Sequence, residues 1–257
     1  MASETIAIVS DIHGNLLALQ ACLRDSEGRG ATRIWCLGDV VGYGARPLEC
    51  LRMLRERDAL IIRGNHEQAV LDGAFGFNPL AAAAIHWTRA QLAQDGNGSE
   101  ALAFLGKLPE RIDTETAVLV HGSPAQPIDE YLFREDAIDR LPRGVDFSPK
   151  LARSFNRIDR PCFVGHTHVP GVIDGDMRWV APGNNGGVYD TGGRKCLINV
   201  GSVGQPRDGD VRAAYALWDG RAVTFRRVEY DVRGTADQIR AVPELPDLLA
   251  QRLLEGW

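Results

Sequence analysis

The stretch Ser10-Asp11-Ile12-His13-Gly14-Asn15 decides the fold that we expect for this chain. It follows the apolar run Ile-Ala-Ile-Val at 6–9 and precedes a helix-like sequence at 16–23. A short apolar run that ends at a glycine turn and leads into a pattern of period 3.6 predicts a buried strand, a turn and a helix. Asp11 and His13 would then lie at the carboxyl end of a strand, where α/β sheets place their ligand sites.

Four further apolar runs end in the same way, beside a glycine and a side chain that can bind a metal ion. The runs at 33–37, 59–62, 116–120 and 162–164 lead into Gly38-Asp39, Gly64-Asn65-His66-Glu67, His121-Gly122 and Gly165-His166-Thr167-His168. Five of the six histidines in the chain belong to this set, and only His86 lies outside it. A lone histidine is usually a core or surface residue, but this many at predicted strand ends indicate a shared site.

The composition excludes several classes of protein. The 257 residues carry a net charge of -5, so no basic field favours non-specific binding to nucleic acid. Five scattered cysteines without C-x-x-C spacing predict buried free thiols in a reducing compartment. The amino terminus has no signal-peptide pattern and no apolar run reaches about 18 residues, so we expect a cytoplasmic protein that does not enter the membrane.

The remaining segments predict a single domain over residues 1–257, because no linker or repeat divides the chain. Residues 68–108 indicate two or three inserted helices, which would cover one face of the sheet or form a lid over the site. Helices are also predicted at 133–141, 149–155 and, as a broken pair, 235–254. The segment 177–230 is rich in strand patterns, with Asp219-Gly220 as a hairpin turn and Asn184-Asn185-Gly186-Gly187 as another tip.

The polar residues at the predicted strand ends combine carboxylates, imidazoles and an amide oxygen without any thiolate. They are Asp11, His13, Asp39, Asn65, His66, His121, His166 and His168. Such a set suits Mn, Fe, Zn, Co or Ni, and it fits two ions that share a carboxylate better than one ion. Two ions about 3.5 to 4 Å apart are a known solution for displacement at phosphorus, and a coordinated water with a pKa of about 7 supplies hydroxide at neutral pH.

In order and spacing, the five blocks resemble the calcineurin-like metallophosphoesterase superfamily, over residues 6 to about 205. The resemblance implies an α/β (α+β) fold, a four-layer αββα sandwich of two mixed β-sheets flanked by helices. It also implies that Asp11, His13 and His168 hold one metal ion, that Asn65, His121 and His166 hold the second, and that Asp39 bridges them. His66 would not be a ligand but would face the phosphoryl group as the catalytic residue, stabilising charge or protonating the leaving oxygen.

One departure from the wider family narrows the substrate. Within that superfamily, the Ser/Thr protein phosphatases and the symmetrical dinucleoside tetraphosphatases that resemble them have Asp-Arg-Gly where this sequence has Gly42-Tyr43-Gly44. A neutral tyrosine cannot replace a bidentate guanidinium. The compact Gly-His-Thr-His block is similar to the small prokaryotic phosphodiesterase-type branch.

Three residues outside the proposed ligand set are candidates for binding the substrate. Arg207 lies in a Gly-rich segment after a predicted strand, where it would clamp phosphate or else pair with Asp208 or Asp210 in a plain turn. Asn15 would touch phosphate or cap the first helix. Tyr43, together with the loop aromatics Phe75, Phe77 and Tyr189, would stack a nucleobase or simply pack.

We therefore expect a phosphoesterase with two divalent metal ions that hydrolyses phosphodiesters or nucleotide-type phosphoanhydrides through metal-bound hydroxide. Manganese is the expected ion, with Fe, Zn, Ni, Co or Mg as alternatives. The expected partner is a small phosphate ester or nucleotide. The alternatives are a phosphomonoesterase or Ser/Thr protein phosphatase and, in another class, a catalytically silent protein-binding scaffold.

Overall fold

The computed structural model describes residues 4–94, 99–145, 148–183 and 187–257, and their strands form two six-stranded mixed sheets. The first sheet has the order β3 (Leu60–Ile61), β2 (Ala31–Cys36), β1 (Thr5–Val9), β11 (Ala213–Trp218), β12 (Ala222–Val228) and β9 (Val188–Asp190). The second has the order β4 (Arg111–Asp113), β5 (Val118–Val120), β6 (Cys162–Val164), β10 (Leu197–Asn199), β7 (Gly171–Ile173) and β8 (Trp179–Val180). Each sheet contains one run of three parallel strands, β3-β2-β1 and β5-β6-β10.

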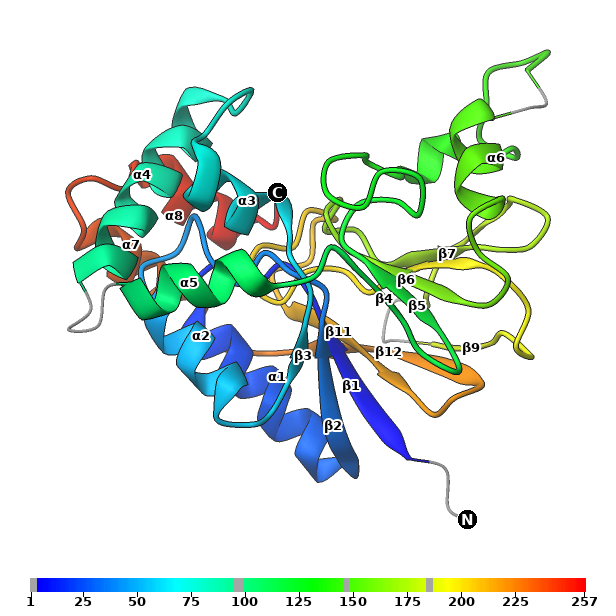
Figure 1. Cartoon of the computed structure of the whole chain (residues 1–257), viewed down its shortest axis with the longest axis horizontal. Helices are drawn as coiled ribbons and strands as arrows, with labels where there is room; N and C mark the ends of the chain where they lie inside the picture. Colours follow the sequence, from blue (N-terminus) through cyan, green and yellow to red (C-terminus); the bar gives the residue numbers. More distant parts are fainter. Residues whose placement is uncertain (1–3, 95–98, 146–147, 184–186) are drawn as a thin grey trace.

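Eight α-helices lie within the described ranges, and they gather on the outer faces of the two sheets and beside the strand ends (Figure 1). They are α1 (Leu16–Gly28), α2 (Pro47–Arg55), α3 (Asn65–Asp72), α4 (Pro79–Gln94), α5 (Ser99–Lys107), α6 (Pro149–Phe155), α7 (Val232–Arg240) and α8 (Asp247–Glu255). In Figure 1, α1 and α2 cover the first sheet, whereas α6 lies on the far side of the second. None of the described helices is long and apolar enough to span a bilayer.

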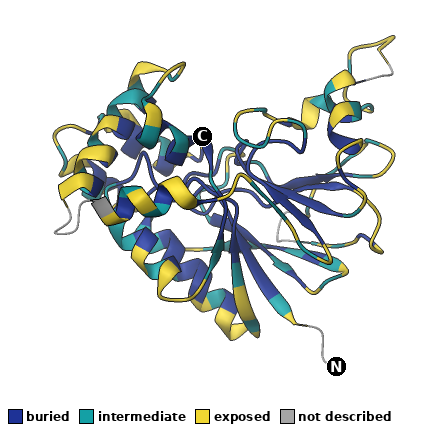
Figure 2. Ribbon diagram, viewed as in Figure 1, coloured by how far each residue is buried: buried dark blue, intermediate teal, exposed yellow. Residues whose placement is uncertain are grey.

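The two-residue period of the strands builds the layers. On β1, Ile6 and Ile8 point into a core shared by both sheets, whereas Ala7 and Val9 point into the core beneath α1 and α2. On β6, Phe163 joins the core between the sheets while its two neighbours pack against α6. Burial is accordingly deepest along the strands and their ends (Figure 2). This arrangement confirms the predicted sandwich of two mixed sheets flanked by helices.

Several predicted elements differ from the structure. The helix expected at 133–141 is only a 3-10 turn, Arg134–Asp136. The amide of Ile138 in this segment donates instead to the carbonyl of Met177, 2.9 Å away, so a tertiary contact replaces the helical hydrogen bond. The short strands β4 and β7 were not predicted, nor was β9 as a separate strand, because each has no more than two consecutive apolar residues. The predicted tip at 184–187 falls mostly outside the described residues.

The other predictions agree well with the structure. The helix at 149–155 has the expected bounds, the segment 68–108 contains the end of α3 and all of α4 and α5, and the tail forms α7 and α8. The five cysteines are buried and free. The chain therefore follows its local sequence signals most closely where apolar runs are long and glycines mark their ends.

Candidate metal centre

The predicted site residues follow the parallel strands of both sheets. The strands β1, β2, β3, β5, β6 and β10 lead into the segments that carry Asp11 and His13, Asp39, Asn65 and His66, His121, His166 and His168, and Arg207, respectively. Parallel strands present their carboxyl ends on one side, so face-to-face packing of the two sheets brings six loops together. The structure thus gathers residues that are distant in the sequence, such as His13 and His168, which are 155 positions apart.

The backbone at this site is strained. Eight non-glycine residues in the described part of the chain have a positive φ, and six of them belong to the site: Asp11, His13, Asp39, Tyr43, His166 and His168. This left-handed conformation costs roughly 1 to 3 kcal/mol for a non-glycine residue and persists only where surrounding structure enforces it. Backbone hydrogen bonds enforce it here, for example from His13 N to Asp39 O (2.9 Å) and from Asp11 N to Gly38 O (3.1 Å).

Backbone carbonyls fix the orientation of three histidine rings. The Nδ1 atoms of His13, His121 and His168 lie 3.2, 2.8 and 2.6 Å from the carbonyl oxygens of Val41, Leu37 and Gln205. A carbonyl oxygen can only accept a hydrogen bond, so each Nδ1 carries the proton. In the neutral ring the lone pair is then on Nε2, which suits a metal ligand held by an outer hydrogen bond.

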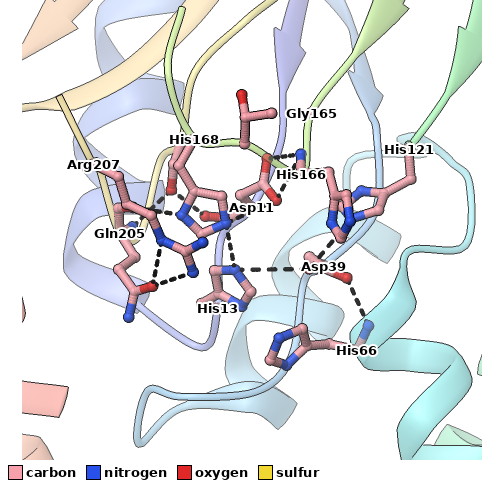
Figure 3. A network of polar contacts seen from close by, with 12 residues as sticks. Asp11, His13, Asp39, His66, His121, Gly165, His166, His168, Gln205 and Arg207 are labelled. Atoms are coloured by element: carbon pink, nitrogen blue, oxygen red, sulfur yellow. Dashed lines mark hydrogen bonds and ion pairs between the residues drawn. The ribbon is translucent and has the colours of Figure 1, made fainter. Parts of the chain in front are cut away.

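Two groups of donors face each other across Asp39 (Figure 3). Asp11, His13 and His168 form one group, and Asp39, His121 and His166 form the other; in each, the ligand atoms lie within 4.8 Å of one another. The Oδ2 atom of Asp39 is 3.7 Å from Nε2 of His13 and 3.4 Å from Nε2 of His121. Asp39 is therefore the carboxylate that reaches both groups.

The remaining candidate ligand atoms lie at the edges of these groups. Oδ1 of Asn65 is 3.0 Å from Nε2 of His121, which adds an amide oxygen to the second group. His66 lies with His13 and Asp39 in a third trio of the same dimensions. Its amide donates to Oδ1 of Asp39 at 2.8 Å, and its Nδ1 is buried without a hydrogen-bond partner among the described residues.

The donor set fits divalent metal ions on two observations of this structure. Nε2 of His13 and Nε2 of His168 are 3.2 Å apart, although both Nδ1 atoms already carry the ring proton. Two lone pairs at this distance repel each other, and a shared cation would relieve the repulsion. Nε2 of His121 faces two oxygen acceptors, on Asp39 and Asn65, so it needs a proton or a metal ion there.

The pKa values describe a site that attracts positive charge. Burial would raise the pKa of Asp11 and Asp39, but the surrounding imidazoles outweigh burial and hold both well below the usual range. Burial lowers the pKa of His121, yet Asp39 and Asp11 together raise it to about 10. Burial lowers the pKa of His166 to about 3, which leaves a neutral ring suited to coordination.

Glu67 is a residue of the centre to which the sequence gave no role. Its carboxylate accepts hydrogen bonds from the amides of Asp39, Val40 and Gly64 at 2.8 Å and of Val41 at 3.2 Å. It is completely buried, and burial with the nearby charge of Asp39 raises its pKa to about 7. Glu67 thus ties the loop after β2 to the start of α3. In the sequence, the only signal for this role of Glu67 was its position directly after His66.

A cavity of about 250 Å³ opens above the ligand cluster. Its lining includes Tyr43, His66, Phe75, Phe77, Tyr131 and Arg207. Tyr43 is buried, and its ring centroid lies 4.7 Å from that of His13 and 4.5 Å from that of His66. A Cβ at Gly42 would clash with Nδ1 of His66, so only glycine leaves room for this ring.

Arg207 and Asn15 have different surroundings. Arg207 donates to Oε1 of Gln205 at 2.7 and 3.2 Å, while Asp208 pairs with Arg227 and Asp210 with Arg212. No carboxylate of a described residue lies within ion-pair distance of Arg207, so the plain-turn alternative lacks its expected ion pair.

The side chain of Asn15 is occupied by the protein itself. Its Oδ1 accepts from the amide of Ala18 and the hydroxyl of Thr235, and its Nδ2 donates to Gly204 O and Tyr230 Oη. It is only 2% exposed and is not among the residues that line the 250 Å³ cavity. The capping role considered from the sequence therefore accounts for the bond with Ala18, and three tertiary hydrogen bonds occupy the rest of the side chain.

The comparisons with known proteins agree with this geometry. The family model of the calcineurin-like phosphoesterase superfamily domain matches residues 5–221. The uncharacterized protein MJ0912 of Methanocaldococcus jannaschii is 38% identical over 265 residues, covering 100% of both chains. The crystal structure of a metallophosphoesterase from Sphaerobacter thermophilus is 40% identical, with a TM-score of 0.82 over 99% of this chain and 100% of that chain.

A shorter similarity connects the chain to a named activity. The symmetrical bis(5′-nucleosyl)-tetraphosphatase of Actinobacillus pleuropneumoniae serotype 5b is 38% identical over 72 residues, 27% of each chain. The family model and the two full-length relatives cover far more of the chain than this segment does. Together with the two donor groups at the strand ends, they show that this protein belongs to the calcineurin-like phosphoesterase superfamily and is a metallophosphoesterase.

Proposed function

We propose that the protein is a dinuclear metal-dependent phosphoesterase that hydrolyses phosphodiesters or nucleotide-type phosphoanhydrides. The observation that carries this proposal is the position of Asp39, whose carboxylate lies between two separate groups of donors that can bind a metal ion. One ion would be held by Asp11, His13 and His168 and the other by Asn65, His121 and His166, with Asp39 shared. When bound, the ions supply a water nucleophile at neutral pH and offset charge on the phosphoryl oxygens. Manganese is the first ion to test, with Fe, Zn, Ni, Co and Mg as alternatives.

His66 is the proposed catalytic residue. Burial lowers its pKa to about 4, so the ring is neutral at pH 7 and can offer an N–H to a phosphoryl or leaving oxygen. This favours charge stabilisation by a hydrogen bond over proton transfer from an imidazolium. Its main-chain bond to Asp39 and its packing against Tyr43 hold the ring at the cavity wall.

Arg207 is the proposed clamp for the phosphoryl group, because its guanidinium lines the cavity and has no carboxylate partner among the described residues. It also lines a second cavity of about 340 Å³, beside Phe133 and Trp179. Room on both sides of one arginine favours a phosphorus atom with two substituents, as in a diester or anhydride. The relative named as a tetraphosphatase supports the anhydride within this class.

The test is the ratio of turnover on bis-p-nitrophenyl phosphate to turnover on p-nitrophenyl phosphate, with enzyme stripped of metal and reconstituted with Mn²⁺. We expect a ratio well above one. A ratio well below one would instead favour the phosphomonoesterase or protein phosphatase, which has the same metal donors but a different substrate contact. No turnover on either compound, or on dinucleoside polyphosphates, would leave the silent scaffold.

A further inference from the structure

Two aromatic side chains on opposite walls of the metal cavity differ in how far other residues pack against them. Phe75 comes from the loop between α3 and α4, and Tyr131 from the loop after β5; these loops lie on opposite sides of the strand ends (Figure 1). Phe75 is 84% exposed, more than any other large apolar side chain that the structure describes. Leaving a whole phenyl ring in water forgoes its burial energy. Its position at the mouth of the cavity calls for an explanation.

Tyr131 is already engaged on its own wall. Its ring stacks on His166, with centroids 3.6 Å apart and planes at 23°, and is parallel to the ring of Phe133 at 5.1 Å. Tyr131 therefore packs against His166, which is a proposed metal ligand. Phe75, by contrast, makes no ring contact with another aromatic side chain in the described part of the chain.

The backbone supports the ring of Phe75 from one side. Gly73 has a φ of +111°, and a Cβ on it would lie 2.9 Å from Cε2 of Phe75, so the ring rests against a residue without a side chain. The amide of Phe75 donates to the carbonyl of Gly73 at 2.9 Å, which closes a tight turn. The loop thus holds the ring in place while its contact with solvent remains large.

The size of the cavity and its polar groups indicate what would cover this ring. Small-molecule sites usually measure about 300 to 1,000 Å³, so a cavity of about 250 Å³ holds a phosphate and leaves the rest of a nucleotide at the mouth. Asp129, whose carboxylate is an acceptor, and Asn78, whose side-chain amide nitrogen is a donor, are also among the lining residues. An acceptor and a donor beside an aromatic ring match the edge and the face of a nucleobase.

We propose that Phe75 is the platform on which the nucleobase of the substrate stacks, and that the enzyme selects nucleotides over phosphate esters without a planar ring. This proposal rests on the proposed phosphoesterase function and names its substrate class. Phe75 would act on binding alone, because the proposed reacting groups lie on the cavity floor.

The experiment compares the affinities of AMP and ribose 5-phosphate for the Mn²⁺-loaded enzyme by calorimetry. The two ligands carry the same phosphate on the same sugar carbon and differ at C1 of the sugar, where AMP has adenine and ribose 5-phosphate has a hydroxyl. We expect AMP to bind at least tenfold more tightly. In Phe75→Ala its Kd should rise by about 5- to 100-fold, while that of ribose 5-phosphate stays unchanged.

Three further variants separate stacking from other effects. Phe75→Trp should keep the preference for AMP, because it keeps an aromatic face, whereas Phe75→Leu should lose most of it. Val188→Ala is the control, since Val188 is 70% exposed on β9 and lines neither of the two cavities described above. Both affinities should be unchanged in it.

The outcomes also distinguish this proposal from the proposed function. Equal binding of AMP and ribose 5-phosphate by an enzyme that hydrolyses bis-p-nitrophenyl phosphate would overturn the platform and keep the phosphoesterase. A Phe75-dependent preference for AMP without any hydrolysis would support the stacking platform and overturn the proposed hydrolytic function. Equal weakening of both ligands in Phe75→Ala would mean that the residue shapes the loop, and neither preference nor hydrolysis in the wild type would overturn both proposals.

Discussion

The floor of the metal cavity, which carries the proposed metal ligands, and its rim, which carries Arg207 and Phe75, are built in different ways. On the floor, the rings of His13, His121 and His168 are each fixed by a carbonyl oxygen, and the loops are tied together by Glu67. On the rim, Arg207 donates to Gln205 and has no carboxylate partner among the described residues, and Phe75 is mostly in solvent. A fixed floor suits a constant reaction, and a sparsely bonded rim suits the choice of substrate. Variants on the floor should therefore remove metal, and variants on the rim should change binding only.

The largest effect should come from the shared carboxylate. Asp39→Ala removes the one side chain that reaches both donor groups, so both ions should be lost. Bound metal stabilises the transition state by several kcal/mol, which makes the expected fall in kcat/KM about 1,000-fold or more. Metal content by plasma mass spectrometry and turnover on bis-p-nitrophenyl phosphate measure it. Asp113→Ala, an exposed carboxylate paired with Arg111, should retain both; full metal loading in Asp39→Ala would contradict the shared site.

His66 lies where the floor meets the rim. His66→Ala should lower kcat by about 100-fold or more with metal content unchanged, because the ring acts on the substrate. The matched control is His86→Ala, which changes an exposed histidine on α4. Loss of one metal ion in His66→Ala would instead make His66 a ligand, in keeping with the trio that it forms with His13 and Asp39.

Glu67→Gln should weaken metal binding, although Glu67 is not one of the proposed metal ligands. The amide keeps one oxygen but turns an NH₂ group towards backbone N–H donors, so the loop after β2 loses its fixed position. Outer partners of this kind typically change metal affinity by about 10- to 100-fold. Titration of the stripped protein with Mn²⁺ measures the affinity. An unchanged affinity beside an unchanged free energy of unfolding would show that the loop keeps its shape without Glu67.

The smallest effect should be on the rim. Arg207→Gln should raise KM for the diester by about tenfold with kcat and metal content nearly unchanged, since a charge-assisted hydrogen bond to phosphate is lost in both ground and transition states. Arg207→Lys keeps the charge without the planar fork and should give an intermediate KM. If kcat fell and KM did not, Arg207 would belong to the reaction rather than to binding.

The same difference explains what the sequence could predict. The floor residues follow apolar runs and glycines, so the pattern located eight candidate site residues at strand ends that the structure brings together. It also favoured a helix at 133–141, where a contact from Ile138 to Met177 prevails. Glu67 had no pattern of its own, and the state of Arg207 depended on which arginines took Asp208 and Asp210. Such choices between neighbours are tertiary and leave no period in the sequence.

Phe75 shows a second limit of prediction from the sequence. The sequence named four loop aromatics for stacking or packing, and their patterns are alike. In the structure Tyr43 is buried against histidines, and Tyr189 lies on β9. The ring centroid of Phe77 lies 5.4 Å from that of His66. Only burial separates these residues, and burial of a loop side chain depends on how distant segments meet.

The left-handed backbone at the proposed metal ligands also has an evolutionary consequence. At Asp11, His13, Asp39, His166 and His168 the conformation suits glycine or asparagine, whereas the chemistry requires a carboxylate or an imidazole. Selection for heat resistance alone would therefore push these positions away from the residues that catalysis needs. The lineage must pay for activity with stability at each of them, and a descendant released from its reaction would be expected to drift first at these five positions.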